Sequence, residues 1–370
     1  MTARRVLVIT GSRAEFGLLR STLEALRAEP AIACSLAVTG SHLLGEHPTI
    51  REIEATCPVD AIVEMQQGAE PRTREADGLA FARGVEGFTN ALMRIDPEFV
   101  LLLGDRIEVF AAATASALLG VRVAHIHGGD VAVGIADDSM RHATTKLSHL
   151  HFPATELSAG RILAMGERPE SVFVVGSPAI DELDSTLPLD DARWSSLGSP
   201  EILVQMHPTG DSDEVEQERV TTLLGSLSGR GRVVVMAPNI DPGCDGIRTA
   251  LARSGLPVIE HLPRPEFLSL LRRLVLFVGN SSAGLLECAA MGVPVLDIGD
   301  RQSGRERGMN VVHTDFITGP HFDSAFEQAA SLDVPCVDAR FGDGATGLRI
   351  ANLLATIDLD QVSVRKRWHS

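Results

Sequence analysis

The 370-residue sequence has few cysteines, no surplus of basic residues and no long hydrophobic run. No apolar stretch reaches the roughly 18 residues of a membrane helix, so we expect no membrane-spanning segment. The five cysteines are scattered and none forms a Cys-x-x-Cys pair, which argues against a disulfide framework or a thiolate zinc site. A formal net charge of -16 argues against a broad nucleic-acid surface, because clustered Lys and Arg bind phosphate backbones. These absences favour a protein of the reducing cytoplasm with neither a nucleic-acid nor a membrane partner.

Hydrophobic residues make up 44% of the chain and charged residues 22%, which is the balance of a folded globular protein. At roughly 100 to 200 residues per domain, the length predicts two domains. Short runs rich in Val, Ile and Leu alternate with longer segments of helical period, as in parallel strands joined by crossover helices. We therefore expect an α/β fold with two Rossmann-like, doubly wound domains facing a central cleft.

The pattern also predicts where the elements and domain boundaries lie. In the first half, the expected strands are 6–10, 33–39, 61–64, 99–103, 122–126, 150–153 and 172–175, and the expected helices include 16–28, 83–95, 109–119 and 138–148. After a linker candidate rich in Pro, Ser and Asp at 176–193, strands are expected at 202–206, 232–237, 258–261, 274–278 and 293–298. The predicted domains are 1–178 and 179–350, with a C-terminal helix and tail, 351–370, placed against the first domain.

Polar residues follow two strands of the first half at the point where each strand ends. The turn 11–17 follows the first strand and opens a helix, so its backbone amides and the Arg13 guanidinium are placed to bind an anion. A tight turn with a solvated Arg13 is the alternative. Gly104, Asp105 and Arg106 come directly after the strand FVLLL, although Asp105 also suits a cap for the helix that starts near Val109.

The densest group of ionisable residues runs from HIHGGD to DDSMRH. A zinc site is one interpretation, but the strand supplies no spaced third ligand to His125 and His127, so no metal is expected. The preferred interpretation takes Asp130, Asp137 and Asp138 as carboxylates whose proton affinity is tuned by crowding and by a nearby arginine, as general acid and base chemistry requires. Asp138 also suits the N-cap of the helix that follows.

In the second half, His207 and Asn239 each follow a strand, so both put polar groups at the expected cleft. The loop 279–284, GNSSAG, has small residues that let a diphosphate approach the backbone, and its amides and hydroxyls can donate hydrogen bonds. Glu287, one turn into the expected helix, is placed to accept hydrogen bonds from ribose hydroxyls. Arg301 brings a cation toward the same loop. A plain strand-to-helix turn is the alternative for 279–284.

Seven motifs, in this order and spacing, closely resemble those of the hydrolysing UDP-N-acetylglucosamine 2-epimerases: GSRAEFG, GDR, HIHGGD with DDSMRHATTKLSHLHF, MHP, PNID, GNSSAGLLE and GDRQSGRE. The resemblance runs from about residue 6 to residue 357 and implies the two-domain fold of the glycosyltransferase-B class. It implies that uridine diphosphate (UDP) is held by Arg13, Arg106, His207, Asn239, Gly279, Ser281, Ser282, Glu287 and Arg301. The catalytic candidates are Asp105, His127, Asp130, Asp137, Asp138 and His207. His127 and Asp130 stand where many relatives have Glu.

The resemblance also implies an activity. A base removes the proton on the carbon that bears the acetamido group while UDP departs, and water then adds to the resulting 2-acetamidoglucal. The products are UDP and a free N-acetylmannosamine-type sugar, with no cofactor or metal. The family also acts on UDP-2,4-diacetamido-trideoxy sugars and on GDP-linked relatives, and self-association as a dimer or tetramer is implied. A glycosyltransferase of the same architecture and a non-catalytic nucleotide-sugar sensor remain alternatives.

Overall fold

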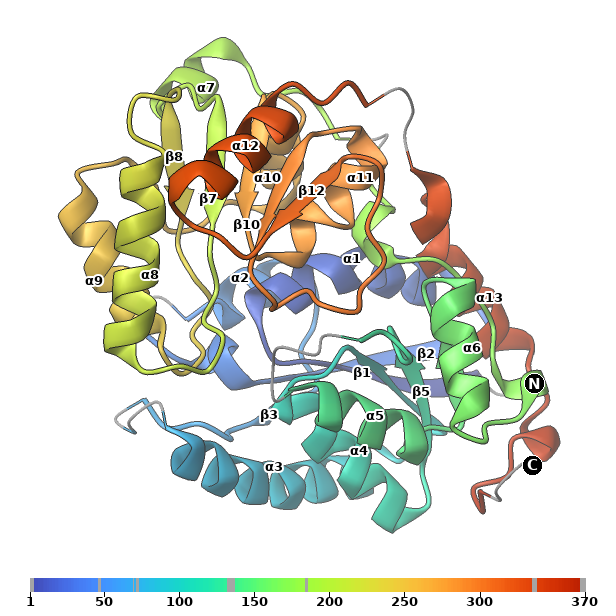
Figure 1. Ribbon diagram of the computed structural model, residues 1–370. Coiled ribbons are helices and arrows are strands. Elements are labelled where there is room, and N and C mark those ends of the chain that lie inside the picture. The colour runs from blue at the N-terminus through green and yellow to red at the C-terminus, as the bar shows by residue number, and fades with distance from the viewer. Residues whose placement is uncertain are drawn as a thin grey trace. The chain divides into compact units, whose positions relative to one another are not determined.

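The computed structural model describes residues 3–45, 48–68, 70, 73–131, 137–183, 186–334 and 338–366. Tertiary contacts divide the chain into two compact units. The first contains residues 1–130, 137–181 and 342–370, and the second contains residues 131–136 and 182–341. Each unit is built on its own six-stranded parallel sheet flanked by helices (Figure 1). The prediction of two doubly wound α/β units is confirmed.

The sheet of the first unit has the strand order β3-β2-β1-β4-β5-β6. Its strands are β1 (Arg4–Thr10), β2 (Ile32–Thr39), β3 (Ala61–Val63), β4 (Phe99–Leu103), β5 (Arg122–Ile126) and β6 (Leu150–Phe152). In this Rossmann arrangement the order reverses between β1 and β4, and ligands bind beyond the carboxyl ends of the strands at that point. The residues that follow β1 and β4 are therefore the first to consider for function.

Helices cover both faces of this sheet, because successive side chains of a buried strand point to opposite sides. The helices of the first unit are α1 (Arg13–Ala28), α2 (Ile50–Thr56), α3 (Arg74–Ile95), α4 (Ile107–Leu119), α5 (Asp137–Leu147), α6 (Glu156–Ala164) and α13 (Thr346–Thr356). Val6 and Val8 face the core that α1 and α13 cover, whereas Leu7 and Ile9 face the core that α3 and α4 cover.

The last helix belongs to the first unit although it follows the second in the sequence. Ile350 and Leu354 of α13 are fully buried in the same core as Leu19 of α1. Residues 342–350, which the pattern placed in the second domain, lie in the first unit. The chain therefore leaves the first unit after Asp181 and returns to it at Gly342.

The second unit repeats the arrangement, with the strand order β12-β11-β10-β7-β8-β9. Its strands are β7 (Ile202–Gln205), β8 (Val233–Met236), β9 (Val258–Ile259), β10 (Leu276–Gly279), β11 (Val295–Ile298) and β12 (Val311–Thr314). Its helices are α7 (Asp191–Ser196), α8 (Asp213–Ser226), α9 (Cys244–Ser254), α10 (Arg264–Leu271), α11 (Glu287–Met291) and α12 (Gly319–Ala330). Here the order reverses between β7 and β10, so His207 and Asn280 stand at the corresponding point.

Some expectations about elements were wrong. Residues 172–175 make a single bridge to the sheet, between Val172 and His151, instead of a full strand. Helix α3 begins at Arg74 and not at 83, because the Thr73 side chain caps it by accepting from the N–H of Ala76. Strand β12 was not anticipated. Within the described ranges, no helix has both the length and the apolar character needed to cross a bilayer.

Candidate functional site

The turn after β1 leaves one arginine available to an anion. Ser12 caps α1 by accepting a hydrogen bond from the N–H of Glu15 at 3.4 Å. Arg13, the first residue of α1, is exposed and makes no ion pair within the described part of the chain. A guanidinium at a helix N-terminus, beside amides with no partner inside the helix, is suited to a diphosphate. The role of Arg13 in holding UDP stays a prediction.

The carboxyl group of Glu108 is buried next to this turn. The Oε1 of Glu108 accepts from Nε2 of Gln66 at 2.7 Å, and its Oε2 lies 3.3 Å from Nε of Arg106. Arg106, expected to hold UDP, therefore has a protein carboxylate as a partner. A Cβ on Gly11 would lie 2.8 Å from Cγ of Glu108, so the turn tolerates only glycine without displacing that side chain.

Glu15 was not among the expected site residues. The pattern Ser-x-x-Glu predicts a capping box, in which the carboxyl group returns to the N-cap. Neither carboxyl oxygen of Glu15 has a partner of hydrogen-bond geometry among the described residues, and the side chain is 5% exposed. Burial, together with the nearby Glu108 charge, raises the pKa of Glu15 to about 8. Glu15 is therefore mostly protonated at neutral pH.

A buried guanidinium joins two of the candidate catalytic carboxylates. Arg141 of α5 is 1% exposed and forms an ion pair with Asp105, which follows β4. Its Nη1 lies 3.9 Å from Oδ2 of Asp130. The alternative in which Asp105 caps α4 was wrong, because the N-cap is Arg106 and makes no side-chain cap bond. A fully buried guanidinium needs such partners, since an unpaired buried charge is costly.

His127 is held at both ring nitrogens by side chains of the first unit. Its Nδ1 lies 2.9 Å from Oδ2 of Asp130, and its Nε2 lies 2.9 Å from Oγ of Ser177. Oδ1 of Asp130 accepts from the hydroxyl of Ser158 at 2.7 Å. The backbone φ of His127 is 63°, in the left-handed region that few non-glycine residues adopt. Ser177 and Ser158 carried no sequence signal of function.

His125 is also enclosed. Its Nε2 donates to the carbonyl of Gly104 at 2.7 Å, and its Nδ1 lies 3.3 Å from Oγ1 of Thr145. Burial lowers the pKa of His125 to about 4, so the ring is neutral at physiological pH. The described residues contain no group of three His, Cys, Asp or Glu side chains placed to hold a metal ion.

Asp138 lies in the first turn of α5, with Oδ2 3.5 Å from Nε2 of His142. The helix begins at Asp137, so the alternative in which Asp138 is the N-cap was wrong. The side chain of Asp137 lies outside the described part of the structure. The side chains of Asp105 and Asp138 are 19% and 20% exposed, which leaves each carboxylate accessible to a small molecule.

In the second unit, Asn280 joins the ends of β7 and β10. Its Oδ1 accepts from the N–H of His207 at 2.7 Å, and its Nδ2 donates to the carbonyl of His207 at 2.8 Å. Nδ1 of His207 in turn accepts from the N–H of Asn239 at 3.1 Å. A neutral His207 therefore carries its proton on Nε2, where it can donate to an anion. The structure thus brings the expected His207 and Asn239 together.

Gly279 permits this joint. Its φ is 147°, and a Cβ there would lie 2.0 Å from the carbonyl oxygen of Gln205 in β7. Only glycine fits such a contact with neighbouring backbone. The predicted role of Gly279 near the ligand is therefore accompanied by a structural one.

Arg301 lies next to the same loop. Its Nε donates to the carbonyl of Pro208 at 3.3 Å, and its Nη1 donates to the carbonyl of Asn280 at 3.2 Å. Gln302, which was not among the expected site residues, donates to the Asn280 carbonyl at 2.8 Å. These bonds hold the Arg301 guanidinium beside the loop, and its role in binding a diphosphate stays a prediction.

We expected a helix to begin at the GNSSAG loop, and the prediction of where it begins was wrong. Ser281 caps a single 3-10 turn, Ser282–Gly284, and the helix α11 begins only at Glu287 and has five residues. The loop therefore leads into a short turn and not into a long helix with a full dipole. Glu287 is 4% exposed and its Oε1 pairs with Nη1 of Arg264 at 3.1 Å, a partner not anticipated.

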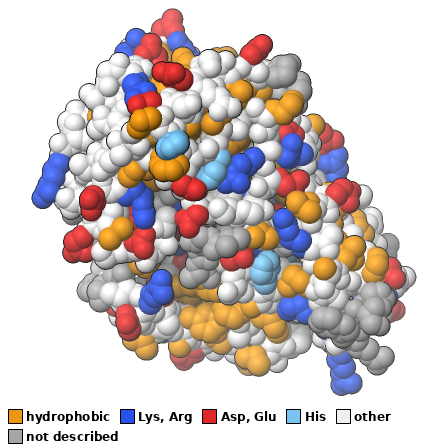
Figure 2. Space-filling view, in the orientation of Figure 1, with side chains coloured by type: hydrophobic (Ala, Val, Ile, Leu, Met, Phe, Trp, Pro, Cys, Tyr) orange, Lys and Arg blue, Asp and Glu red, His pale blue; other side chains and the backbone are white. Residues whose placement is uncertain are grey.

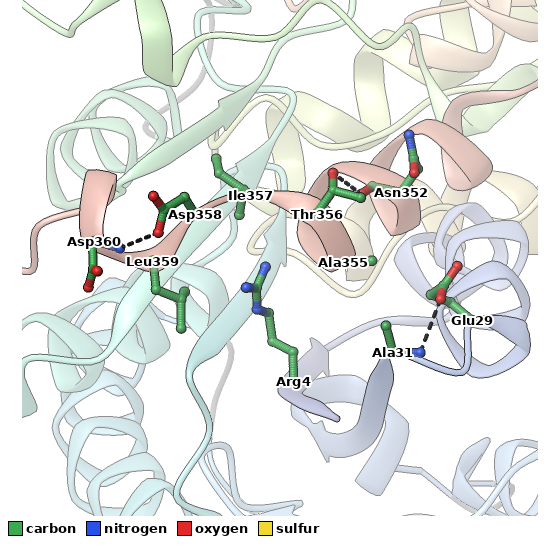
Figure 3. Close-up of a pocket in the computed structure, with 10 residues that line it drawn as sticks. All are labelled: Arg4, Glu29, Ala31, Asn352, Ala355, Thr356, Ile357, Asp358, Leu359 and Asp360. Carbon is green, nitrogen blue, oxygen red and sulfur yellow. Dashed lines mark hydrogen bonds between the residues drawn. The ribbon is translucent and has the colours of Figure 1, made fainter. Parts of the chain in front are cut away.

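A depression in the first unit lies away from all these residues. Figure 3 shows Arg4, Glu29 and Ala31 opposite Asn352 and residues 355–360. Arg4 opens β1, whereas the candidate residues follow the carboxyl ends of strands, at the other edge of the sheet. The guanidinium of Arg4 donates to the carbonyl of Leu354, so this region fastens α13 to the sheet.

Comparison with known proteins identifies the family. A family model described as UDP-N-acetylglucosamine 2-epimerase matches residues 24–355. The chain is 33% identical to the UDP-N,N'-diacetylbacillosamine 2-epimerase (hydrolyzing) of Legionella pneumophila, over 98% of each chain. It is 32% identical to a UDP-N-acetylglucosamine 2-epimerase of Neisseria meningitidis serogroup B, over 99% of this chain and 98% of the relative.

The crystal structure of Methanocaldococcus jannaschii UDP-GlcNAc 2-epimerase in complex with UDP-GlcNAc and UDP shares the fold. Its TM-score is 0.80 at 19% identity, with 95% of this chain and 99% of that chain covered. The glycosyltransferase-B-like fold class expected from the motifs is therefore confirmed, and so is the family resemblance. With the family model spanning most of its length, the chain belongs to the UDP-N-acetylglucosamine 2-epimerase family.

Proposed function

We propose that the protein is a hydrolysing 2-epimerase. It converts a UDP-linked 2-acetamido sugar and water into UDP and a free sugar with inverted configuration at the second carbon. The substrate is UDP-N-acetylglucosamine or a UDP-2,4-diacetamido-trideoxy sugar. The observation that carries the proposal is the pair of carboxylates, Asp105 and Asp130, on one buried guanidinium, Arg141, beside the carboxyl ends of β4 and β5. The relative from Legionella, whose name includes hydrolyzing, supports the same choice.

In the first half of the reaction, a carboxylate of the first unit takes the proton from the second carbon while the bond between the anomeric carbon and UDP breaks. The electron pair of the C–H bond forms the double bond of a 2-acetamidoglucal, and the pair of the broken C–O bond leaves with UDP. That C–H group is a weak acid, so the reaction needs stabilisation of the charge that grows on the departing diphosphate. Arg13, His207, Arg301 and the amides of residues 281–284 are our candidates for that stabilisation.

In the second half, water supplies its hydroxyl to the anomeric carbon, and a proton is delivered to the second carbon. Inversion requires that this proton arrive on the face opposite the one from which the first was removed. Two different groups must therefore handle the two protons. Asp105 and Asp138, each about one-fifth exposed, are the two carboxylates that we assign to this work. No metal or cofactor takes part in the proposed steps.

We also propose that the first unit carries a self-association surface. Leu79 and Met93 of α3 and Leu118 of α4 are 62%, 71% and 76% exposed. Figure 2 shows hydrophobic side chains gathered over the region of α3 and α4. Large apolar side chains clustered on one face favour burial against another surface. A second copy of the chain is the occupant that we assign, as a homodimer or homotetramer.

The function is tested by incubating the purified protein with each UDP-sugar in deuterium oxide and following the products by NMR. We expect UDP, free sugar and deuterium at the second carbon. Asp105→Asn should lose this activity, and its matched control is Asp96→Asn, since Asp96 lies on the surface of the first unit with its side chain 85% exposed. The control variant should retain wild-type activity.

Three outcomes would contradict the proposal. A UDP-linked epimer without free sugar would indicate a non-hydrolysing epimerase. Release of UDP only when an acceptor is added, with the C2 hydrogen retained, would indicate a glycosyltransferase. Binding without turnover for every sugar tested would indicate a sensor.

A further inference from the structure

Ser177 lies at the inner end of a chain of contacts that leads to the candidate catalytic carboxylates. We propose that Ser177 is a positioning residue for the reaction, because its hydroxyl holds His127 in the orientation and tautomer that support Asp130 beside Arg141. This inference rests on the proposed function. It assigns a role to a side chain that is fully buried and that acts through His127.

The hydrogen-bond partners determine which nitrogen of His127 carries the proton. An ionised Asp130 can only accept hydrogen bonds, so the Nδ1 of His127, 2.9 Å from its Oδ2, must be protonated. In the neutral ring, Nε2 then has a lone pair and accepts from the hydroxyl of Ser177 at 2.9 Å. The order of donation is therefore from Ser177 to His127 and from His127 to Asp130.

A hydroxyl also suits the protonated ring. The Oγ of Ser177 accepts from the N–H of Ala179 at 3.2 Å, which leaves the hydroxyl one hydrogen to donate and a second lone pair. When the imidazole is neutral, Ser177 donates to Nε2; when it is protonated, the hydroxyl rotates and accepts from Nε2–H. The hydroxyl of Ser177 can therefore bond to Nε2 in either form of the ring, whose side chain is only 8% exposed.

The contacts extend from His127 through Asp130 and Arg141 to the Asp105 carboxylate, which we assign to catalysis. Asp130 lies 3.9 Å from Nη1 of Arg141, which also pairs with Asp105. The charge on Asp130 therefore offsets part of the charge on Arg141, and this changes how strongly Arg141 holds the Asp105 carboxylate. Asp130 contacts His127 directly and His125 interacts with it electrostatically, whereas Arg141 reaches it through Asp130.

Ser177 has a structural role as well, since it is the N-cap of the 3-10 turn Pro178–Ile180. If Ser177 acts only as a cap, Ser177→Ala should have a lower melting temperature and an unchanged pH profile of kcat. A positioning role predicts a change in catalysis that depends on pH. The pH profile of kcat therefore separates the two roles.

The test compares the full-length wild type with Ser177→Ala and Ser177→Thr, using the UDP-sugar that the wild type turns over. We expect Ser177→Ala to lower kcat about tenfold to hundredfold, from the loss of one buried hydrogen bond, with an unchanged KM and a displaced pH limb of kcat. Ser177→Thr, which keeps the hydroxyl, should restore most of the rate. The matched control is Ser116→Ala, a fully buried hydroxyl that donates to the Ala112 carbonyl within α4.

A second measurement needs no turnover. Nitrogen-15 NMR of the imidazoles at neutral pH, with His127 assigned from a His127→Asn spectrum, should show Nδ1 protonated and Nε2 as a hydrogen-bond acceptor. The Nε2 resonance should move in Ser177→Ala. An active wild type whose Ser177→Ala variant keeps its kcat and pH profile, or a His127 with the proton on Nε2 alone, would overturn the inference. An inactive wild type would instead refute the proposed function.

Discussion

The side-chain amide of Asn280 makes two hydrogen bonds to the backbone of His207, one through Oδ1 and one through Nδ2. This bridge holds the ends of β7 and β10 together where the strand order of the second unit reverses. Asn280→Ala removes both bonds and should weaken UDP binding about tenfold or more, as measured by calorimetry. Asn352→Ala, in α13 of the first unit, is the control and should bind UDP normally. A folded Asn280→Ala protein with wild-type affinity would contradict the assignment.

Asp105→Asn removes a charged acid–base group but keeps the size of the side chain. We expect kcat to fall about 10² to 10⁴-fold, the usual contribution of a positioned general base or acid. UDP affinity should change little, because the nucleotide-binding candidates of the second unit are unaltered. Turnover and UDP titration on the same preparation check the two halves of this prediction, and equal losses in both would count against a catalytic role.

Gly279→Ala places a methyl group 2.0 Å from the backbone oxygen of Gln205, at a φ of 147°. Backbone cannot move aside as a flexible side chain can, so we expect a large drop in melting temperature or failure to fold. Gly225→Ala is the matched control, because it lies in α8 with nothing within 4 Å of the added Cβ. That variant should be stabilised by about 0.5–1 kcal/mol. Similar melting temperatures for the two variants would contradict the prediction.

Glu15 should make stability depend on pH. Because its folded pKa of about 8 lies above the ordinary 4.5, the folded state binds this proton more tightly than the unfolded chain. The free energy of unfolding contributed by this group therefore falls as pH rises from about 4.5 to about 8. Glu15→Gln should flatten that part of the curve and be more stable than the wild type above pH 8. Melting temperatures across the range, with the exposed Glu24→Gln as control, test this, and parallel curves for Glu15→Gln and the wild type would argue against it.

The proposed self-association surface gives a further prediction. Leu118→Glu adds a charge to a side chain that is 76% exposed, so the monomer should fold normally while an interface there is disrupted. We expect a lower molar mass by light scattering at equal concentration. Leu187→Glu, at a residue 82% exposed in the second unit, should leave the mass unchanged. A monomeric wild type would refute the surface.

The fold was largely predictable because parallel strands buried on both faces give continuous runs of apolar residues. Runs such as FVLLL therefore marked β4 to the residue. Helix α3 was predicted too short, since its start depends on the Thr73 cap rather than on an apolar stripe. Strand β12, VVHT, carries a polar His313 and has only four residues, too weak a pattern to recognise.

The positions of candidate residues were predictable where they lie at the carboxyl end of a strand, as Asp105, His207 and Gly279 do. The Ser177–His127 contact was not, because it joins side chains 50 positions apart in the sequence. Glu15 was missed for another reason. Its motif predicts a capping role, and only the packing in the structure shows that the carboxyl group is buried close to Glu108.

The return of α13 to the first unit affects the order in which the two units can fold during synthesis. The core that contains Leu19 also needs Ile350, Leu354 and Val362, whereas the second unit is complete once residue 341 has been synthesised. On the ribosome, the N-terminal part therefore waits for the last residues before its hydrophobic surface is closed, although N-terminal domains ordinarily fold first. A nascent chain stalled before residue 346 would expose that surface to chaperones.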